Sequence, residues 1–215
     1  MDFIHLPNDH FIGWWRFNEG QGDTCQDSSG NQHHLNLIGN PKWFSGRSGT
    51  AIHTGKACAT GTIDPRFKTN DTFSLMAWVN TTNPETQEAT DFTLDFMGRH
   101  CTLGYNTEST EIYLDCPGLH LSDRYPRVRV YTEVNIDDGR WHHIAGLYDG
   151  NSISIYVDGS INTRVDATGL IDPWDDSALT ITTHGLIDEV RLYNRALSTP
   201  EIDAIVHEPF LSDPD

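Results

Sequence analysis

The sequence predicts an all-β fold, a two-sheet antiparallel β-sandwich with one short helix near its C-terminal end. The clearest observation lies in residues 137–159, where Ile153, Ile155 and Val157 recur at every second position. This period is typical of a strand with one buried face. An Asp-Gly pair stands before and after that strand, and such pairs close tight hairpin turns. The segment therefore predicts paired strands, the building unit of a sandwich.

Other segments supply the remaining predicted elements. Residues 73–79 are apolar on both pleat faces, as expected of a central strand, and Trp78 within them is expected in the core. Residues 98–105 and 111–116 predict a hairpin around a polar loop, and an alternating strand follows near residue 127. Ser198, followed by Thr-Pro-Glu, predicts the start of a short helix.

The register of the predicted hairpin sets two cysteines opposite each other. If Tyr105 pairs with Ile112, then Cys101 pairs with Cys116, because antiparallel partners keep a constant sum of residue numbers. Opposed Cβ atoms lie about 4.5–5.5 Å apart, which permits a disulfide after a small adjustment. The cysteines left to pair with each other are Cys25 and Cys58. Four cysteines allow three connectivities, and four reduced core thiols are the other interpretation.

The composition fits a single domain, 1–215 with a core of about residues 11–207, because β-sandwiches of about 200–250 residues fold without dividing. The chain has 14 basic and 31 acidic residues, a formal net charge of −17. This charge argues against nucleic acid and anionic membranes as general partners. We expect no membrane insertion, since no run of about 18 apolar residues occurs, and no signal peptide in this chain.

Three blocks carry a resemblance to a known family. They are residues 15–20 with 27–31, residues 141–159, and residues 185–198. The sequence motifs in these blocks are Trp-Arg-Phe-Asn-Glu-Gly, Asp-Ser-Ser-Gly-Asn, Trp-His-His, Tyr-Asp-Gly, Tyr-Val-Asp-Gly and Ile-Asp-Glu-Val-Arg-Leu-Tyr-Asn-Arg-Ala-Leu-Ser. The chain resembles the LamG-like jelly-roll group of the concanavalin A-like lectin and glucanase superfamily over nearly its whole length. The resemblance implies a jelly roll with Trp141 and one of Trp14 and Trp15 in its core.

The same resemblance implies a function and a setting. The expected protein is a carbohydrate-binding, lectin-like module, secreted or extracellular, whose partners are a glycan or polysaccharide and other domains of a larger secreted protein. Sandwiches of this kind also serve as enzymes and as extracellular protein-adhesion modules, so both alternatives stay open.

A structural calcium ion is also implied by the resemblance, between the N-terminal loop and the acid of the closing strand. Ca²⁺ prefers six to eight oxygen ligands held by tight turns. The expected ligands are Asp27 and Asp188, with Asn18, Gly30 and Asn31 as weaker donors. The other interpretation is that Asp27 makes an Asx-type turn and Asp188 caps a strand.

Polar side chains share one face of three neighbouring predicted strands, because they alternate with apolar residues and cysteines. The residues predicted to bind ligand there are His100, Tyr113, Asp115, Arg127, Arg129 and Tyr131. Carboxylates and guanidinium groups pair with sugar hydroxyl groups, and aromatic rings stack on sugar C–H groups. The alternative is an ordinary solvated face with cross-strand ion pairs. The loop residues expected around this face are Trp174, which otherwise anchors its own loop, Arg99 and Tyr105.

Catalysis is a separate question. The Glu-x-Asp-x-x-Glu spacing of glucanases in this superfamily is absent, so the chain lacks the motif of a retaining glycoside hydrolase. A polysaccharide lyase is the enzymatic alternative, since such enzymes combine an arginine that neutralises a uronate with a histidine or tyrosine base. Its catalytic residues would be His100, Tyr113, Arg127, Arg129 and Tyr131.

Overall fold

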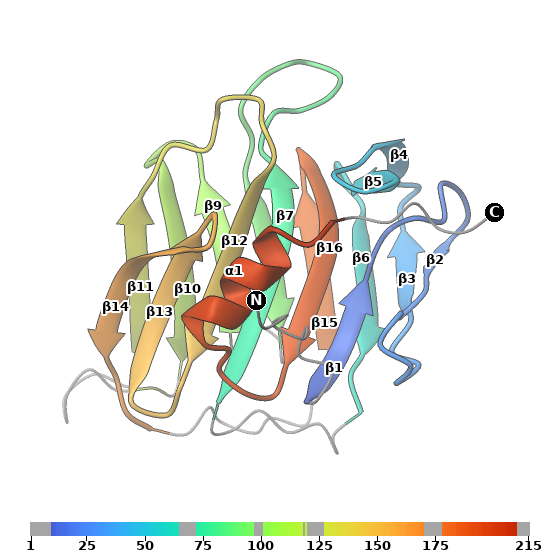
Figure 1. Cartoon of the computed structure of the whole chain (residues 1–215). Coiled ribbons are helices and arrows are strands. Elements are labelled where there is room, and N and C mark those ends of the chain that lie inside the picture. The colour runs from blue at the N-terminus through green and yellow to red at the C-terminus, as the bar shows by residue number, and fades with distance from the viewer. Residues whose placement is uncertain are drawn as a thin grey trace.

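The fold is a sandwich of two antiparallel sheets with one helix against an outer face (Figure 1). The computed structural model describes residues 10–64, 72–96, 101–117, 119, 127–169 and 178–209, with only the backbone of residue 127. Within these residues, each sheet has eight strands. The predicted all-β sandwich is confirmed.

We call the two sheets A and B. In spatial order, sheet A contains β14 (Ser160–Asp166), β13 (Ser152–Val157), β12 (His142–Tyr148), β7 (Phe73–Asn80), β16 (Leu186–Tyr193), β5 (Thr50–His53) and β4 (Lys42–Ser45), and β1 (Phe11–Trp15) also pairs with β16. Sheet B contains β11 (Arg127–Glu133), β10 (Glu111–Pro117), β9 (Cys101–Asn106), β8 (Phe92–Phe96), β15 (Ala178–Thr183), β6 (Cys58–Thr62), β3 (Leu35–Ile38) and β2 (Thr24–Cys25).

The hairpins form as the local sequence predicts. In the β9–β10 pair, Tyr105 lies opposite Ile112 and Leu103 opposite Leu114, so the expected register is confirmed. The turn from β13 to β14 contains Asp158 with a φ of 49° and Gly159 with a φ of 80°. Two consecutive positive φ values are the geometry of a type I′ turn, whose twist matches that of the flanking strands.

The main core fills the space between the sheets. Inward positions of β7, β12, β13 and β16 meet those of β8, β9, β10 and β15, and their apolar side chains are almost fully buried. Trp15 is the largest of them, and its indole N–H donates to the carbonyl of His33 at 2.7 Å. A buried indole needs such a partner, so this bond fixes the N-terminal loop as well as the core.

Trp43 is partly buried and packs against this core, whereas the remaining described tryptophans lie outside it. Trp78 is buried as expected, but on the outer face of sheet A, where the guanidinium of Arg47 covers its ring at 4.6 Å. Trp14 and Trp141 are half-buried. The expected burial of Trp78 is therefore confirmed, and it lies on the outer face because alternation along β7 places every second residue there. The expectation of a core position is wrong for Trp141, which precedes β12.

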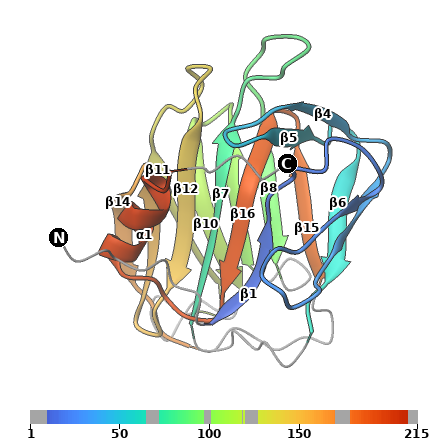
Figure 2. The ribbon, with the colours of Figure 1, turned by 45° about the vertical axis from the view of Figure 1, so that its right-hand side comes forward.

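The helix α1 (Thr199–Val206) lies across the outer face of sheet A (Figure 2). Glu201 accepts hydrogen bonds from the Ser198 backbone N–H at 2.8 Å and from its hydroxyl at 2.7 Å, so the predicted helix start is confirmed. Ile202 and Ile205 pack in a second apolar cluster with Met76 and Tyr156 of the sheet. In the part of the chain that the structure describes, no helix has the length and apolar character needed to cross a membrane.

Candidate functional site

The outer face of sheet B carries most of the predicted ligand residues, and no described helix covers it (Figures 1 and 2). We define the polar face as the outward residues of six neighbouring strands, which are Arg129, Tyr131, Glu133, Glu111, Tyr113, Asp115, Thr102, Thr93, Asp95, Thr180, Thr182 and Thr60. The β10–β11 register pairs Asp115 with Arg129 and Tyr113 with Tyr131. The predicted gathering of these four side chains on one face is therefore confirmed.

Tyr113 lies flat on the sheet. A Cβ atom built on Gly104 would come within 2.6 Å of the phenol carbon and oxygen, so the absence of a side chain at Gly104 makes room for the ring. The guanidinium carbon of Arg129 stands 4.0 Å from the ring centre on Tyr113. This contact is a cation–π stack that holds the arginine plane over the sheet. Tyr113 thus supports Arg129, and its ring is not an open stacking surface.

Tyr131 supplies the exposed ring of the polar face. It is 53% exposed on β11 and lies opposite Tyr113 in the register. Directly opposed residues in an antiparallel pair have Cβ atoms about 4.5–5.5 Å apart. Tyr131 and the Arg129 stack are therefore adjacent, so one ligand can contact a ring and a guanidinium group together.

Hydroxyl groups extend the polar face beyond Tyr113. Thr102 donates to Asp95 at 2.6 Å, the hydroxyl oxygens of Thr93 and Thr182 are 2.6 Å apart, and Thr60 and Thr180 form a similar pair at 3.0 Å. Sequence reasoning missed β8, β15 and β6 as part of the site. The signal was present as alternation, because Phe92, Leu94 and Phe96 occupy the inward positions of β8.

Burial raises the pKa of Tyr113, and the nearby carboxylate of Asp95 adds to this effect, although Arg129 opposes it. The phenol therefore keeps its proton at neutral pH and serves as a hydrogen-bond donor. A catalytic base needs a pKa near the working pH. The environment of Tyr113 thus favours binding over proton abstraction.

Tyr105 does not belong to the polar face, so this prediction is wrong. It is 1% exposed and packs in the core, and its hydroxyl donates to Asp137 at 2.7 Å. Its odd position in β9 points it inward with Leu103, on the face opposite Thr102. The predicted residues Arg99, His100 and Trp174, and the side chain of Arg127, lie outside the described residues.

The predicted calcium ligands fall into two groups, one in the loop at residues 27–31 and one beside the turn at residues 46–50. The Asp27 carboxylate accepts the backbone N–H groups of Trp14, Ser29 and His33 at 2.8–3.0 Å, so it makes the Asx-type turn, and Gly30 and Asn31 lie in the same loop. Asn31 binds the carbonyl groups of β1 through its amide nitrogen. This loop therefore uses its polar groups mainly to close itself against β1.

Asn18 and Asp188 both hold the turn at residues 46–50. Asp188 accepts the Ser48 N–H at 3.0 Å, and Asn18 accepts the Thr50 N–H at 3.0 Å. Burial raises the pKa of Asp188 to about 8. Among the described residues, no three His, Cys, Asp or Glu side chains group as a metal site. An ion at this turn would need oxygen atoms from the backbone and from Asn18, so calcium binding stays a prediction.

All four cysteines are free thiols in this structure. Cys101 and Cys116 are buried in contact, and burial together with the neighbouring Cys101 thiol raises the pKa of Cys116. Cys25 lies opposite Leu35 and faces the core, whereas Cys58 lies opposite Ile38, an outward residue. Pairing of Cys25 with Cys58 is wrong, because the two thiols lie on opposite faces of sheet B.

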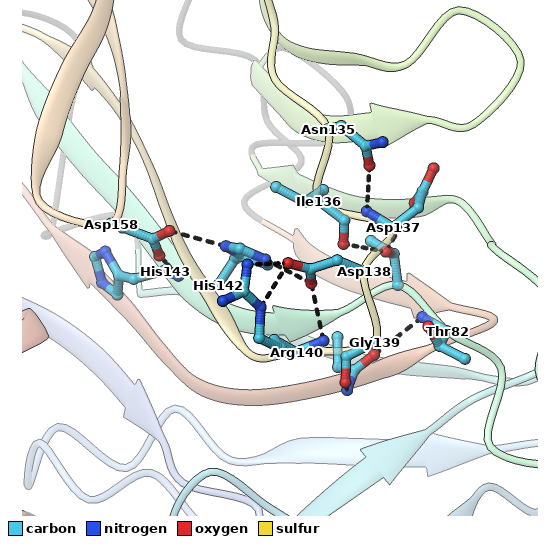
Figure 3. Close-up of polar contacts among 12 residues, drawn as sticks. Thr82, Asn135, Ile136, Asp137, Asp138, Gly139, Arg140, His142, His143 and Asp158 are labelled. Carbon is cyan, nitrogen blue, oxygen red and sulfur yellow. Dashed lines mark hydrogen bonds and ion pairs between the residues drawn. The ribbon is translucent and has the colours of Figure 1, made fainter.

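A second polar cluster lies at one end of the sandwich, between the loop before β12 and the turn after β13 (Figure 3). The His142 ring is 2.8 Å from a carboxylate oxygen of Asp158 and 3.0 Å from one of Asp138. The hydrogen bond with Asp158 is the main cause of a raised pKa at His142, and burial opposes it. Its neighbour His143 points to the other side, where burial and Arg191 lower its pKa to about 3. These contacts join two loops and leave His142 no ring nitrogen for a ligand.

Comparison with known proteins adds two findings. Residues 53–203 match the family described as the concanavalin A-like lectin/glucanases superfamily. Among curated proteins, no relative matches.

Several solved structures that resemble this chain are binding domains of toxins. The binding domain of Paraclostridial Mosquitocidal Protein 1 has a TM-score of 0.71 at 14% identity, over 93% of this chain and 52% of that one. The binding domain of Botulinum neurotoxin DC in complex with rat synaptotagmin II gives 0.69 at 12% identity, over 93% and 51%. The same domain in complex with SialylT gives 0.68 at 13% identity, over 93% and 51%. At these identities the likeness shows a shared fold, and the chain spans about half the length of those domains.

Proposed function

Because this chain belongs to the concanavalin A-like lectin/glucanase superfamily, we propose that it is a carbohydrate-binding module whose polar face takes a glycan. The stack of Arg129 on Tyr113 beside the exposed ring of Tyr131 carries this proposal. A sugar offers the matching surfaces, since its C–H faces stack on an aromatic ring while its hydroxyl groups pair with planar donors and carboxylates.

The charge of the polar face limits the glycan. Four of its residues are acidic, and Arg129 is its one described cation. Anionic sugars would meet repulsion from these carboxylates, whereas neutral hydroxyl groups can donate to them. The face therefore supports binding of a neutral glycan.

The comparisons support a binding role of this general kind. Two of the similar structures are binding domains in complex with a partner, rat synaptotagmin II in one case and SialylT in the other. The likeness to these binding domains and the family resemblance also support three further parts of the proposal. They are an extracellular location, a structural calcium ion, and a place for this domain within a longer protein. Each of these elements is independent of the polar face.

The test begins with a glycan array and continues with calorimetric titration of the tightest neutral glycan. We expect Tyr131→Ala to weaken binding by about tenfold or more, as for aromatic residues that anchor a ligand. Ile161→Ala is the matched control, because Ile161 is 46% exposed on β14, outside the polar face, and its loss should leave the affinity unchanged.

Two results would count against the proposal. Equal affinities for the wild type and Tyr131→Ala would place the glycan elsewhere. Release of an unsaturated sugar product from a polysaccharide would mean that the chain is a lyase rather than a binding module.

A further inference from the structure

A pocket of about 220 Å³ opens on the outer face of sheet A, on the opposite side of the sandwich from the polar face. Its floor consists of outward side chains of β12 and β13, one wall holds Asp149 and Arg164, and the other is the segment 196–199 that leads into α1. We call it the α1 pocket. Pockets for drug-sized ligands occupy about 300–1,000 Å³, so this one suits a smaller molecule.

The floor contains a serine hydroxyl group without a protein partner among the described residues. Ser154 is 6% exposed and stands between Ser152 and Tyr156 on the same face of β13. Ser152 donates to Asp149 at 2.9 Å, and the Tyr156 hydroxyl is 3.1 Å from that of Thr199. Ser154, in contrast, has no hydrogen-bond partner among the described residues. Because Ser154 lines the pocket, its hydroxyl group is free to hydrogen-bond a polar ligand there.

The walls combine charge with apolar surface. A guanidinium nitrogen of Arg164 is 3.0 Å from the Asp149 carboxylate, in a pair that remains partly exposed. Burial tends to raise the pKa of Asp149, but hydrogen bonds from Asn151 and Ser152 outweigh it and the pKa is lowered. The wall thus presents an acceptor and a donor side by side, without net charge. Leu147 and Leu197, each 4% exposed, add apolar surface.

These features together describe the recognition of one sugar ring. Adjacent donor and acceptor groups suit vicinal hydroxyl groups, the Ser154 hydroxyl can pair with a third, and the leucines suit ring C–H groups. We propose that the α1 pocket binds a single neutral pyranose unit, either free or at the end of a glycan. This site does not depend on the polar face, and with it the domain would hold sugar on both sheets.

The test uses the full chain, labelled with ¹⁵N and titrated with methyl glucopyranoside, methyl galactopyranoside, methyl mannopyranoside and glycerol. We expect a pyranoside to shift the amide signals of residues 147–156 and 196–199 in a saturable way, and glycerol to bind at least about tenfold more weakly. An oligosaccharide ending in the same unit should shift the same signals if the pocket accepts chain ends. Shifts from the free glycoside alone would restrict the proposal to monosaccharides.

Two substitutions of Ser154 test the pocket itself. Ser154→Val fills the floor and should weaken binding by about tenfold or more, whereas Ser154→Ala keeps the space and removes only the hydroxyl, with a loss of about fivefold. Ser160→Val introduces the same serine-to-valine substitution at an exposed position of β14 and should leave the affinity for the pyranoside unchanged. Tyr131→Ala should also leave this site intact, which separates it from the polar face.

The proposal is overturned if no pyranoside gives saturable shifts, because water alone would then satisfy Ser154. It is equally overturned if glycerol binds as tightly as the sugars, or if folded Ser154→Ala binds as tightly as the wild type.

Discussion

Replacement of His142 by alanine should destabilise the protein in a pH-dependent way. The side chain is only 11% exposed and joins Asp158 at 2.8 Å and Asp138 at 3.0 Å (Figure 3). One hydrogen bond between the charged His142 and a carboxylate contributes about 1.5–3 kcal/mol. The second His142–carboxylate pair adds about 0–1 kcal/mol, because both carboxylates are partly exposed. We therefore expect a loss of roughly 2–3 kcal/mol at low pH, or about 5–10 °C in Tm for a chain of this length.

The sign of the pH dependence follows from the raised pKa of His142. The folded state holds this proton more tightly than the unfolded chain, whose histidine pKa is about 6.5. The stabilisation is complete below that pH and is lost as the pH rises through the folded pKa. This stabilisation is measured by thermal unfolding of the wild type and His142→Ala at about pH 5.5 and pH 9. The difference in Tm between the two proteins should be larger at pH 5.5.

The control is Arg140→Ala, which removes another partner of Asp138 but no group that titrates in this range. His143, with a pKa near 3, is present in every protein compared, so its titration cancels in the difference. An equal difference in Tm at both pH values would refute the assignment of a charged His142 in the folded state.

Three further predictions concern the polar face, the thiols and calcium. Gly104→Ala should lower both glycan affinity and Tm, because its Cβ would meet the Tyr113 ring at 2.6 Å, and unchanged binding would contradict the role of this stack. Refolding with oxidised glutathione should join Cys101 to Cys116 and lower the intact mass by two hydrogens, and peptide mapping that finds only free thiols would refute it. Removal of calcium with a chelator should lower the Tm by about 5–10 °C if the calcium site is nearly saturated beforehand, whereas an unchanged Tm would exclude a structural calcium ion.

The strands and their local pairing could be predicted because they depend on neighbours in sequence. Alternation identified β13, and the constant sum of paired residue numbers gave the β9–β10 register, including the contact between Cys101 and Cys116. The same rule placed Tyr113 and Arg129 on one face. These features need only the period of a strand and the position of a turn.

Features that depend on the order of strands in space could not be obtained in this way. The sequence does not show that β15 lies between β8 and β6, so the threonines of β15 were not recognised as neighbours of Asp95. The sequence pairs Cys25 with Cys58 only because they are the two cysteines left. The face of sheet B on which each thiol lies follows from the registers of β2 and β6 with β3. The α1 pocket likewise needs the packing of α1 on sheet A.

The most direct test of the account is an amide-shift map of the ¹⁵N-labelled chain with the tightest neutral glycan from the array. If the polar face binds the glycan, the largest shifts fall on residues 111–115 and 129–133, and Tyr131→Ala requires about tenfold more glycan or more to reach them. Shifts confined to residues 147–156 and 196–199 would leave the α1 pocket as the sugar site. The absence of binding to any glycan would contradict the assignment of this domain as a carbohydrate-binding module.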